Sequence, residues 1–269
     1  MTKHRVVVVA ALVALLGIVA VLLVYGGRSS RAPRAAASSD KPLVLPPLSA
    51  EQEIVSLAVP GSDGARVSVP IGAEQPRPIV IVLHAEAERA DQQCKIWREI
   101  TTARPFVLCP QLAAKASHAE VEKQLRGALR ELKQTFGDYV AKGSVVLVGF
   151  GSGAEHAVEI ARQEPSFFAR LVLVDAGHEG WSATSAGAYK QRGGQRLLFV
   201  CSSDRCRAAL EPRLPIIRSQ NLAVELLHAG DLPGALDPRM VARLKERFSW
   251  LTSNEQPKRV PNPRGVVPE

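Results

Sequence analysis

The chain has 269 residues, of which 46% are hydrophobic and 5% aromatic, enough apolar material for one sizeable domain with a buried core. Its formal net charge is +8, but residues 1–41 hold six basic residues against one acidic residue, so most of the excess lies at the N-terminal end. The remaining body is close to neutral and has no aromatic residues interleaved with basic ones. This composition excludes a nucleic-acid-binding surface, and we expect no nucleic acid as a partner.

The most hydrophobic stretch of the chain is Val6–Tyr25, twenty residues without a charge. A helix of that length spans a hydrocarbon core of about 30 Å. Cleaved signal peptides have a shorter apolar region of roughly 7–15 residues, with the cleavage site close behind it. Here Arg28, Arg31 and Arg34 precede the small residues at 35–37. The stretch therefore predicts an uncleaved transmembrane helix, with a cleaved signal peptide as the alternative.

Composition divides the chain into four parts. We predict a cytoplasmic stub and membrane anchor at 1–27 and a flexible linker, rich in Ser, Ala, Arg and Pro, at 28–49. One globular domain is expected at 50–254. The tail at 255–269 contains four prolines and is predicted to be disordered.

All four cysteines lie in the globular part: Cys94, Cys109, Cys201 and Cys206. None forms a Cys-x-x-Cys pair and no two histidines have metal-ligand spacing, so we expect no metal. An even number fits two disulfides in an oxidising compartment, and of three possible connectivities nearness in sequence favours Cys201–Cys206, leaving Cys94–Cys109. Basic residues on the two sides of the anchor balance, so the cysteines decide the orientation. We expect a single-pass membrane protein with its domain on the extracytoplasmic side; reduced thiols in a cytoplasmic domain are the alternative.

Short apolar runs alternate with amphipathic stretches throughout the body. The first two runs flank the turn sequence PGSDG and predict an antiparallel hairpin. Strands are expected at 54–59, 66–71, 78–83, 106–109, 145–148, 171–174, 197–200 and 222–227, and helices at 91–102, 118–136, 154–164 and 238–251. Strands that alternate with helices indicate an α/β fold, with a mainly parallel sheet covered by helices on both faces.

The turn after the central strand, Gly149-Phe150-Gly151-Ser152-Gly153, is where the chemistry should be sought, because it opens a helix directly behind a buried strand. One interpretation is a dinucleotide site. Gly149-x-Gly151-x-x-Ala154 matches that fingerprint, and Asp175 ends the next strand, where a ribose-binding acid would lie. A dinucleotide fold normally begins with this unit, whereas here it comes in mid-chain. An NAD(P)-binding oxidoreductase remains the second alternative.

The order of the elements across the domain resembles the α/β-hydrolase fold, and bacterial serine esterases in particular. The chain has an antiparallel start, His84 after the strand PIVIVL where those enzymes often have His-Gly, and a strand–turn–helix unit in mid-chain. In that family the turn is G-x-S-x-G and holds the nucleophilic serine. Aligning Gly149 and Gly153 with the flanking glycines puts Gly151 in the nucleophile position.

The resemblance implies a degenerate site, because glycine offers no nucleophile. Ser152 follows the apex, where the family uses the backbone N–H for the oxyanion hole; capping of the following helix is its structural alternative. His84, Ala85 and Ser152 are the candidate oxyanion and cleft residues. Glu86 would place negative charge where an oxyanion must form.

The other members of a triad are also displaced. Asp204 is the candidate acid, with Asp175 one strand earlier as an alternative. The resemblance puts the base near 230–234, where no histidine occurs. The closest candidate is His228, at the preceding strand end. Other histidines are interpreted as solvated side chains: His118, His156 and His178.

We therefore expect a membrane-anchored α/β-hydrolase-fold protein of a bacterial envelope that is catalytically inactive and needs no cofactor. It would bind an unidentified small molecule, peptide or protein in the former substrate cleft. The first alternative is an active serine esterase that uses Ser152 with His228 and either Asp204 or Asp175.

The predicted anchor can be tested by extraction. We expect the protein to stay with membranes after a carbonate wash, because Val6–Tyr25 is long enough to span and no cleavage site lies close behind it. Recovery of a soluble species that begins near Ser38 would instead identify a cleaved signal peptide.

Overall fold

A computed structural model of the chain describes residues 44–253, apart from 87, 229 and 232–236. The predicted anchor Val6–Tyr25, most of the predicted linker and nearly all of the predicted tail lie outside the described residues. Within the described part, none of the helices combines the length and the apolar character that a membrane crossing requires.

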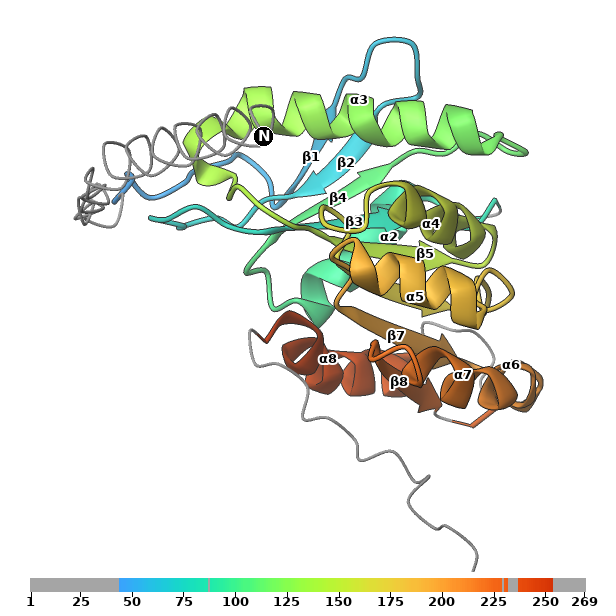
Figure 1. The fold of residues 1–269 in the computed structure, drawn as a ribbon. Helices are drawn as coiled ribbons and strands as arrows, with labels where there is room; N and C mark the ends of the chain where they lie inside the picture. The colour runs from blue at the N-terminus through green and yellow to red at the C-terminus, as the bar shows by residue number, and fades with distance from the viewer. Residues whose placement is uncertain (1–43, 87, 229, 232–236, 254–269) are drawn as a thin grey trace, which may run out of the picture. The chain divides into compact units, whose positions relative to one another are not determined.

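The centre of the domain is an eight-stranded sheet with the order β1-β2-β4-β3-β5-β6-β7-β8 (Figure 1). β2 pairs antiparallel with β1 and β4, and every other pairing is parallel. The strands are β1 (Ile54–Leu57), β2 (Ala65–Ser68), β3 (Ile79–Leu83), β4 (Phe106–Pro110), β5 (Val146–Phe150), β6 (Arg170–Val174), β7 (Arg196–Cys201) and β8 (Ala223–His228). The predicted hairpin and the mainly parallel sheet are confirmed.

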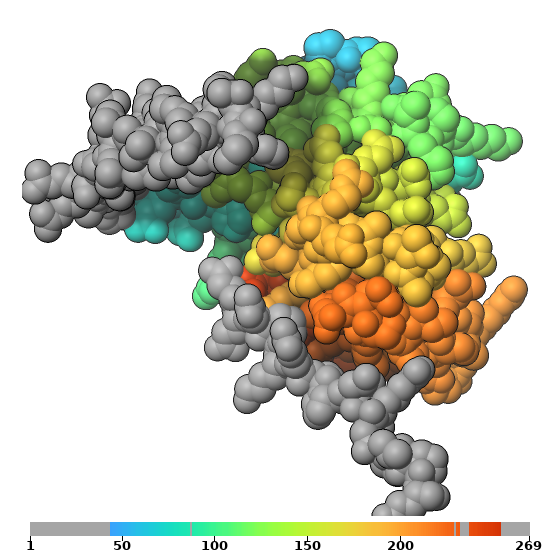
Figure 2. All heavy atoms as spheres, viewed as in Figure 1, coloured from blue at the N-terminus to red at the C-terminus, as the bar shows by residue number. Residues whose placement is uncertain are grey.

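Helices cover both faces of the sheet. Those of one face are α3 (His118–Phe136), α4 (Ser152–Gln163), α5 (Ala183–Gln191), α6 (Asp204–Leu210) and α7 (Leu214–Arg218), and those of the other are α2 (Ala90–Ile100) and α8 (Pro238–Thr252). Short 3-10 helices follow α3 (Gly137–Tyr139) and α6 (Glu211–Arg213). Figure 2 shows the outer surface of the first layer, from green over α3 to orange over α6 and α7.

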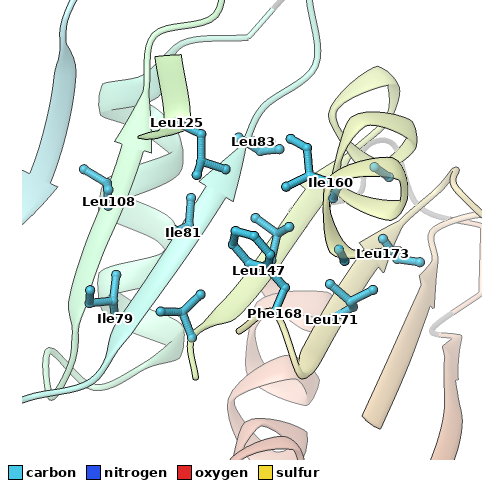
Figure 3. Close-up of a cluster of buried hydrophobic side chains, with 14 of the residues drawn as sticks. Ile79, Ile81, Leu83, Leu108, Leu125, Leu147, Ile160, Phe168, Leu171 and Leu173 are labelled. Carbon is cyan, nitrogen blue, oxygen red and sulfur yellow. The ribbon is translucent and has the colours of Figure 1, made fainter. Parts of the chain in front are cut away.

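The two apolar layers follow from the alternation of side chains along buried strands. On β3, Ile79, Ile81 and Leu83 join the cluster under α3 and α4, whereas Val80 and Val82 join the cluster under α2 and α8. Figure 3 shows the first of these clusters, in which side chains of the central strands meet those of α3 and α4. Both faces are buried, so these strands are continuous apolar runs.

The end of the predicted linker belongs to the domain. Leu45 and Leu48 donate backbone hydrogen bonds to Glu74 and Ala73, both at 2.9 Å. The Tyr139 hydroxyl donates to the Pro46 carbonyl at 2.8 Å. The predicted boundary at residue 49 is therefore too late, because Ser- and Pro-rich composition does not reveal backbone pairing.

The two predicted disulfides are confirmed. Cys94–Cys109 ties α2 to β4 with a Cα–Cα separation of 5.9 Å, and Cys201–Cys206 ties the end of β7 to α6 at 5.4 Å. Both separations lie in the usual range for a disulfide. Each bond therefore fixes a helix against the strand that it accompanies.

The disulfides should differ in their effect on stability. They close loops of 15 and 5 residues. Loop entropy then predicts a loss of about 3 kcal/mol of unfolding free energy for the Cys94→Ala/Cys109→Ala pair and about 2 kcal/mol for Cys201→Ala/Cys206→Ala. Urea unfolding of the two double variants beside the parent measures the order. An equal or reversed order would show that native-state packing, not loop length, dominates.

Candidate active site

The turn after β5 has an unusual backbone conformation at its apex. Gly151 has φ 50° and ψ −122°, a region that residues with a side chain rarely adopt. Its N–H donates to the Val174 carbonyl at 3.0 Å, which ties the apex to the end of β6. α4 begins at the next residue, Ser152. The chain therefore reverses sharply at the carboxyl edge of the sheet.

The two flanking glycines are required by close packing. A Cβ on Gly149 would lie 2.3 Å from the Cα of Ala154, and one on Gly153 would lie 2.2 Å from the carbonyl oxygen of Leu83. Real Cβ atoms do not approach so closely, so α4 can lie this near to β5 and β3 only with glycine at both positions. The spacing of these glycines places Gly151 at the apex, as the alignment predicted. A Cβ on Gly151 itself would lie 3.2 Å from that of Ala85.

Ser152 does not cap α4. The N-cap residue is Gly151, which makes no side-chain cap hydrogen bond, and Ser152 is the first residue of the helix. Its Oγ instead accepts a hydrogen bond from the Glu86 N–H at 3.3 Å. The cap interpretation is therefore wrong: Ser152 connects the elbow to the loop after β3.

His84 holds that loop in place through hydrogen bonds of its buried imidazole ring. Its side chain is buried, Nδ1 lies 2.7 Å from the Ala85 carbonyl oxygen, and Nε2 accepts from the Leu112 N–H at 3.0 Å. A carbonyl can only accept and an amide N–H can only donate, so a neutral imidazole with its proton on Nδ1 satisfies both partners. His84 therefore has a structural role between β3 and the segment after β4.

Both backbone donors at the start of the loop are occupied by side chains. The Ala85 N–H donates to Glu88 Oε2 at 3.2 Å, and the Glu86 N–H donates to Ser152 Oγ. In active members of this fold an N–H of this loop completes the oxyanion hole. The Glu86 carboxylate accepts from the Lys115 N–H at 2.8 Å. In this arrangement the loop is bonded to its own domain rather than open to an oxyanion.

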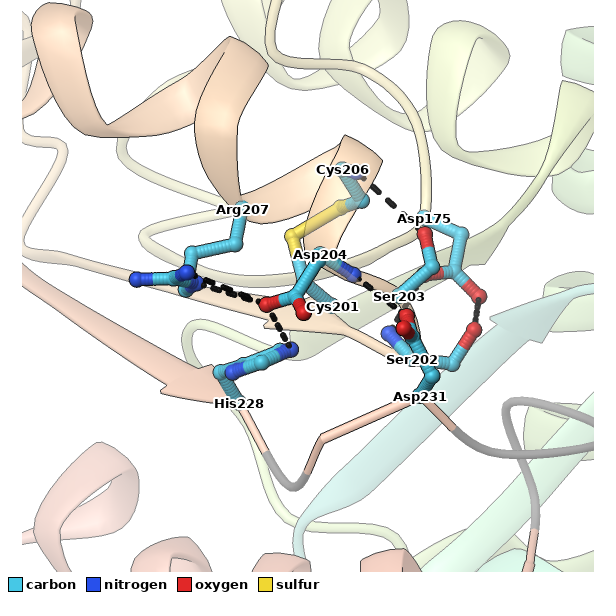
Figure 4. The surroundings of a disulfide bond; sticks show 9 residues. All are labelled: Asp175, Cys201, Ser202, Ser203, Asp204, Cys206, Arg207, His228 and Asp231. Atoms are coloured by element: carbon cyan, nitrogen blue, oxygen red, sulfur yellow. Dashed lines mark hydrogen bonds and ion pairs between the residues drawn. A yellow bond between two sulfur atoms is a disulfide. The ribbon is translucent and has the colours of Figure 1, made fainter.

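The candidate acid and base are neighbours, in an orientation that differs from a triad (Figure 4). Asp204 begins α6 and His228 ends β8, and their Oδ1 and Nε2 atoms are 3.6 Å apart. This distance is an ion-pair contact rather than a hydrogen bond, and Nε2 is buried with no hydrogen-bond partner among the described residues. In a triad the acid faces Nδ1 and Nε2 faces the nucleophile. Arg207 also bonds to Asp204, at 3.0 Å.

Both carboxylate oxygens of Asp175 are hydrogen-bonded to Ser202. Its two carboxylate oxygens accept from the N–H and the Oγ of Ser202, each at 2.7 Å, which joins the ends of β6 and β7. Asp175 is therefore not placed as the acid for His228. The sheet order also differs from the 3-2-1-4-5-6 order of a dinucleotide-binding fold. The sheet therefore does not have the strand order that a dinucleotide site at the glycine turn would require.

The three predicted catalytic residues form two separate groups. Ser152 bonds to the loop at Glu86, and His228 lies against Asp204. Across the described segments, no hydrogen bond connects the serine to the histidine. The structure therefore brings together the acid and the base but not the nucleophile.

A histidine pair beside the loop could not be seen in the sequence. His118 opens α3 and His156 lies in α4, and their Nδ1 atoms are 2.6 Å apart. His118 is exposed, as the interpretation as a solvated side chain predicts, whereas His156 is partly buried and contacts it. Burial and the nearby His118 lower the pKa of His156, against an opposing influence of Glu86. In the described part of the chain no three metal-binding side chains are grouped, so the pair is not part of a larger metal centre.

Comparison with known proteins identifies the fold. No family model and no curated protein matches the sequence. Among solved structures, Est1E from Butyrivibrio proteoclasticus has a TM-score of 0.55 and 10% identity, over 74% of this chain and 99% of that one. The S-formylglutathione hydrolase FrmB from Staphylococcus aureus has a TM-score of 0.53 and 14% identity, over 78% and 100%. A second S-formylglutathione hydrolase, from Agrobacterium tumefaciens, has a TM-score of 0.53 and 13% identity, over 73% of this chain and 92% of that one. The chain has the α/β-hydrolase fold, as the order of its elements predicted.

The histidine pair predicts a pH dependence of stability. The pKa of His156 is lowered in the folded state from an ordinary value of 6.5, so the unfolded chain binds more protons between the two values. Stability should therefore fall as the pH drops through 6.5 toward the folded pKa. His156→Asn should lose less stability than the parent between about pH 8 and about pH 5 in urea unfolding. His178→Asn, which removes a histidine outside the pair, is the control; an identical pH dependence in all three proteins would contradict the prediction.

Proposed function

We propose that this protein is a membrane-anchored α/β-hydrolase-fold protein that does not cleave esters and acts as a binding module at its former catalytic edge. The observation that carries the proposal is the glycine at the apex of the elbow. Gly151 occupies the position of the nucleophile and has no side chain that could attack an acyl carbon. The fold is kept because the flanking glycines still allow α4 to approach the sheet.

The surroundings of the elbow support the absence of catalysis. A serine is activated by a base within hydrogen-bond reach, and its oxyanion needs free N–H donors. Ser152 accepts a bond from the very loop that would supply a donor, and the other loop N–H, that of Ala85, is bonded to Glu88. His228 turns Nε2 toward Asp204. The arrangement of the base and of these two loop N–H groups therefore supports the proposed absence of catalysis.

The second candidate function, an active serine esterase, rests on the contact between Asp204 and His228. Asp204 begins the helix after β7 and His228 ends β8, close to the loops from which the fold takes its acid and base. An esterase that uses Ser152 would need the Ser152–Glu86 bond to break and the His228 ring to turn, so that Nδ1 faces the acid. The solved structures that resemble this domain include hydrolases and esterases, which is the reason to test this alternative directly.

The location of the protein is part of the proposal. The uncharged stretch Val6–Tyr25 supports a single membrane span, and two disulfides support an oxidising, extracytoplasmic compartment for the domain. A ligand held at the carboxyl edge would then be a small molecule, a peptide or a protein of the envelope.

Two activity assays test the proposal. The purified protein should neither react with a fluorophosphonate nor hydrolyse short p-nitrophenyl esters above a blank. Gly151→Ser should also remain inactive, because a hydroxyl without its base stays protonated. Gly151→Ala is the matched control: both variants force a Cβ into the left-handed turn and should lose about 1–3 kcal/mol of unfolding free energy.

Covalent labelling by the fluorophosphonate is the result that would contradict the proposal. Stoichiometric labelling by the fluorophosphonate that disappears in Ser152→Ala would make Ser152 a nucleophile and overturn the proposal. Labelling lost also in His228→Ala would identify the base, and the protein would be an esterase with a displaced elbow.

A further inference from the structure

A cavity of about 610 Å³ lies at the edge of the sheet opposite the elbow, where the parallel strands begin. Its walls come from the segments that lead into β3, β4, β5 and β6, from the end of α2, and from α8. The cavity is independent of the proposed function, because none of the elbow or loop residues discussed above lines it. Its volume is typical of sites that hold a small organic ligand.

Among the described residues, four cations and no carboxylate line this cavity. Arg77 and Arg104 each lie two residues before a strand, Arg170 is the first residue of β6, and Lys245 comes from α8. Parallel strands all begin at the same edge, so the topology gathers these charges although they are distant in sequence. Like charges around one low-dielectric space repel one another. A bound anion would be attracted by each of the four cations and would offset their mutual repulsion.

Two of these arginines are incompletely bonded. Nε of Arg77 and Nε of Arg170 are buried and have no hydrogen-bond partner among the described residues. Arg170 donates to the Ser144 hydroxyl at 3.2 Å, and burial together with the charge of Arg196 lowers the pKa of Arg170. A buried donor without an acceptor costs about 1–3 kcal/mol, so the domain keeps these groups at an energetic disadvantage.

Some arginines elsewhere on the domain are paired with acids. Arg126 bonds to Glu122 at 2.7 Å and to Glu164 at 2.8 Å, and Arg98 bonds to Glu53 at 2.9 Å. The described residues that line the cavity, by contrast, offer no acid to its arginines. An anion from outside the chain would supply such a partner.

The loop that brings Arg104 to the cavity has a strained backbone. Thr102 has φ 53° and Ala103 has φ 55°, two successive residues with side chains in the left-handed region. Such residues cost of order 1 kcal/mol or more each and persist where the surroundings require them. The strain is located where α2 ends and the chain turns toward Arg104 and β4.

Both hydroxyl and apolar side chains line the rest of the cavity. Ile100, Pro105 and Phe248 are among the apolar ones, and Phe248 also packs edge-on against Trp97 with ring centroids 6.5 Å apart. A fully hydrated inorganic ion would leave this apolar wall unused. The lining therefore suits a ligand that has a charged head and a compact apolar body.

We propose that this cavity binds an organic phosphate monoester, with the phosphate near the arginines and the apolar body against Phe248. A phosphate offers two negative charges and several acceptors to the four cations, whereas a carboxylate offers one charge. The same chemistry occurs in soluble phosphate esters and in the head group of phosphatidic acid, so the test must separate these sources.

The test is titration calorimetry on the full-length protein in an uncharged detergent, with phenyl phosphate as the probe. Inorganic phosphate should bind more weakly than phenyl phosphate, and phenol should not bind detectably. Arg104→Gln and Lys245→Gln should each raise the Kd for phenyl phosphate about tenfold, because each removes one charged contact. The matched control is Arg247→Gln, which removes the same charge from α8 at a residue paired with Glu225 outside the cavity and should leave the Kd unchanged.

Competition identifies the source of the ligand. Displacement of phenyl phosphate by a short-chain phosphatidic acid but not by glycerol 3-phosphate assigns a lipid head group, and the reverse assigns a soluble ester; either supports the site. No binding of phenyl phosphate at millimolar concentration would overturn the proposal. So would binding that both cavity variants leave intact, or that Arg247→Gln weakens equally, since the interaction would then follow net charge alone.

Discussion

The close approach of α4 to the sheet is the constraint on which the candidate site depends. No Cβ fits at Gly149 or Gly153, so the helix must begin immediately behind β5, and the residue between them must take a strained turn. In an enzyme of this fold a serine accepts that strain in return for an exposed hydroxyl. Glycine adopts the same turn at little cost. The turn between strand and helix can therefore form with glycine at its apex as well as with serine.

Most polar groups around the elbow are bonded inside the domain, although Nε2 of His228 at the same edge has no hydrogen-bond partner among the described residues. At the elbow, the N–H groups of Ala85 and Glu86 and both ring nitrogens of His84 have partners inside the domain. Such a network stabilises the loop in the conformation that the structure shows. At the opposite edge, Arg77 and Arg170 keep buried donors without partners among the described residues. Buried polar groups are normally bonded, so these two donors are the observation on which the proposed anion site rests.

The parallel sheet explains why these two regions are distinct. Strand ends of one kind meet at one edge, so residues that follow β3, β5, β7 and β8 gather around the elbow, and residues that precede β3, β4 and β6 gather around the cationic cavity. The cores on the two faces hold both edges rigid. The two edges of one sheet can thus carry different sets of polar groups.

The sequence by itself determined the features that depend on local pattern. Apolar periodicity gave the sheet strands and the long helices α3 and α8, and the glycine spacing gave the apex at Gly151. It missed α5, α6 and α7, which are short; α5 buries only Ala186 and Tyr189. Only the tertiary structure decided that Ser152 bonds to a loop 66 residues away and that two histidines 38 residues apart share a contact. These contacts, like the cationic cavity, depend on where separate segments meet in space, and no periodicity along the chain encodes that placement.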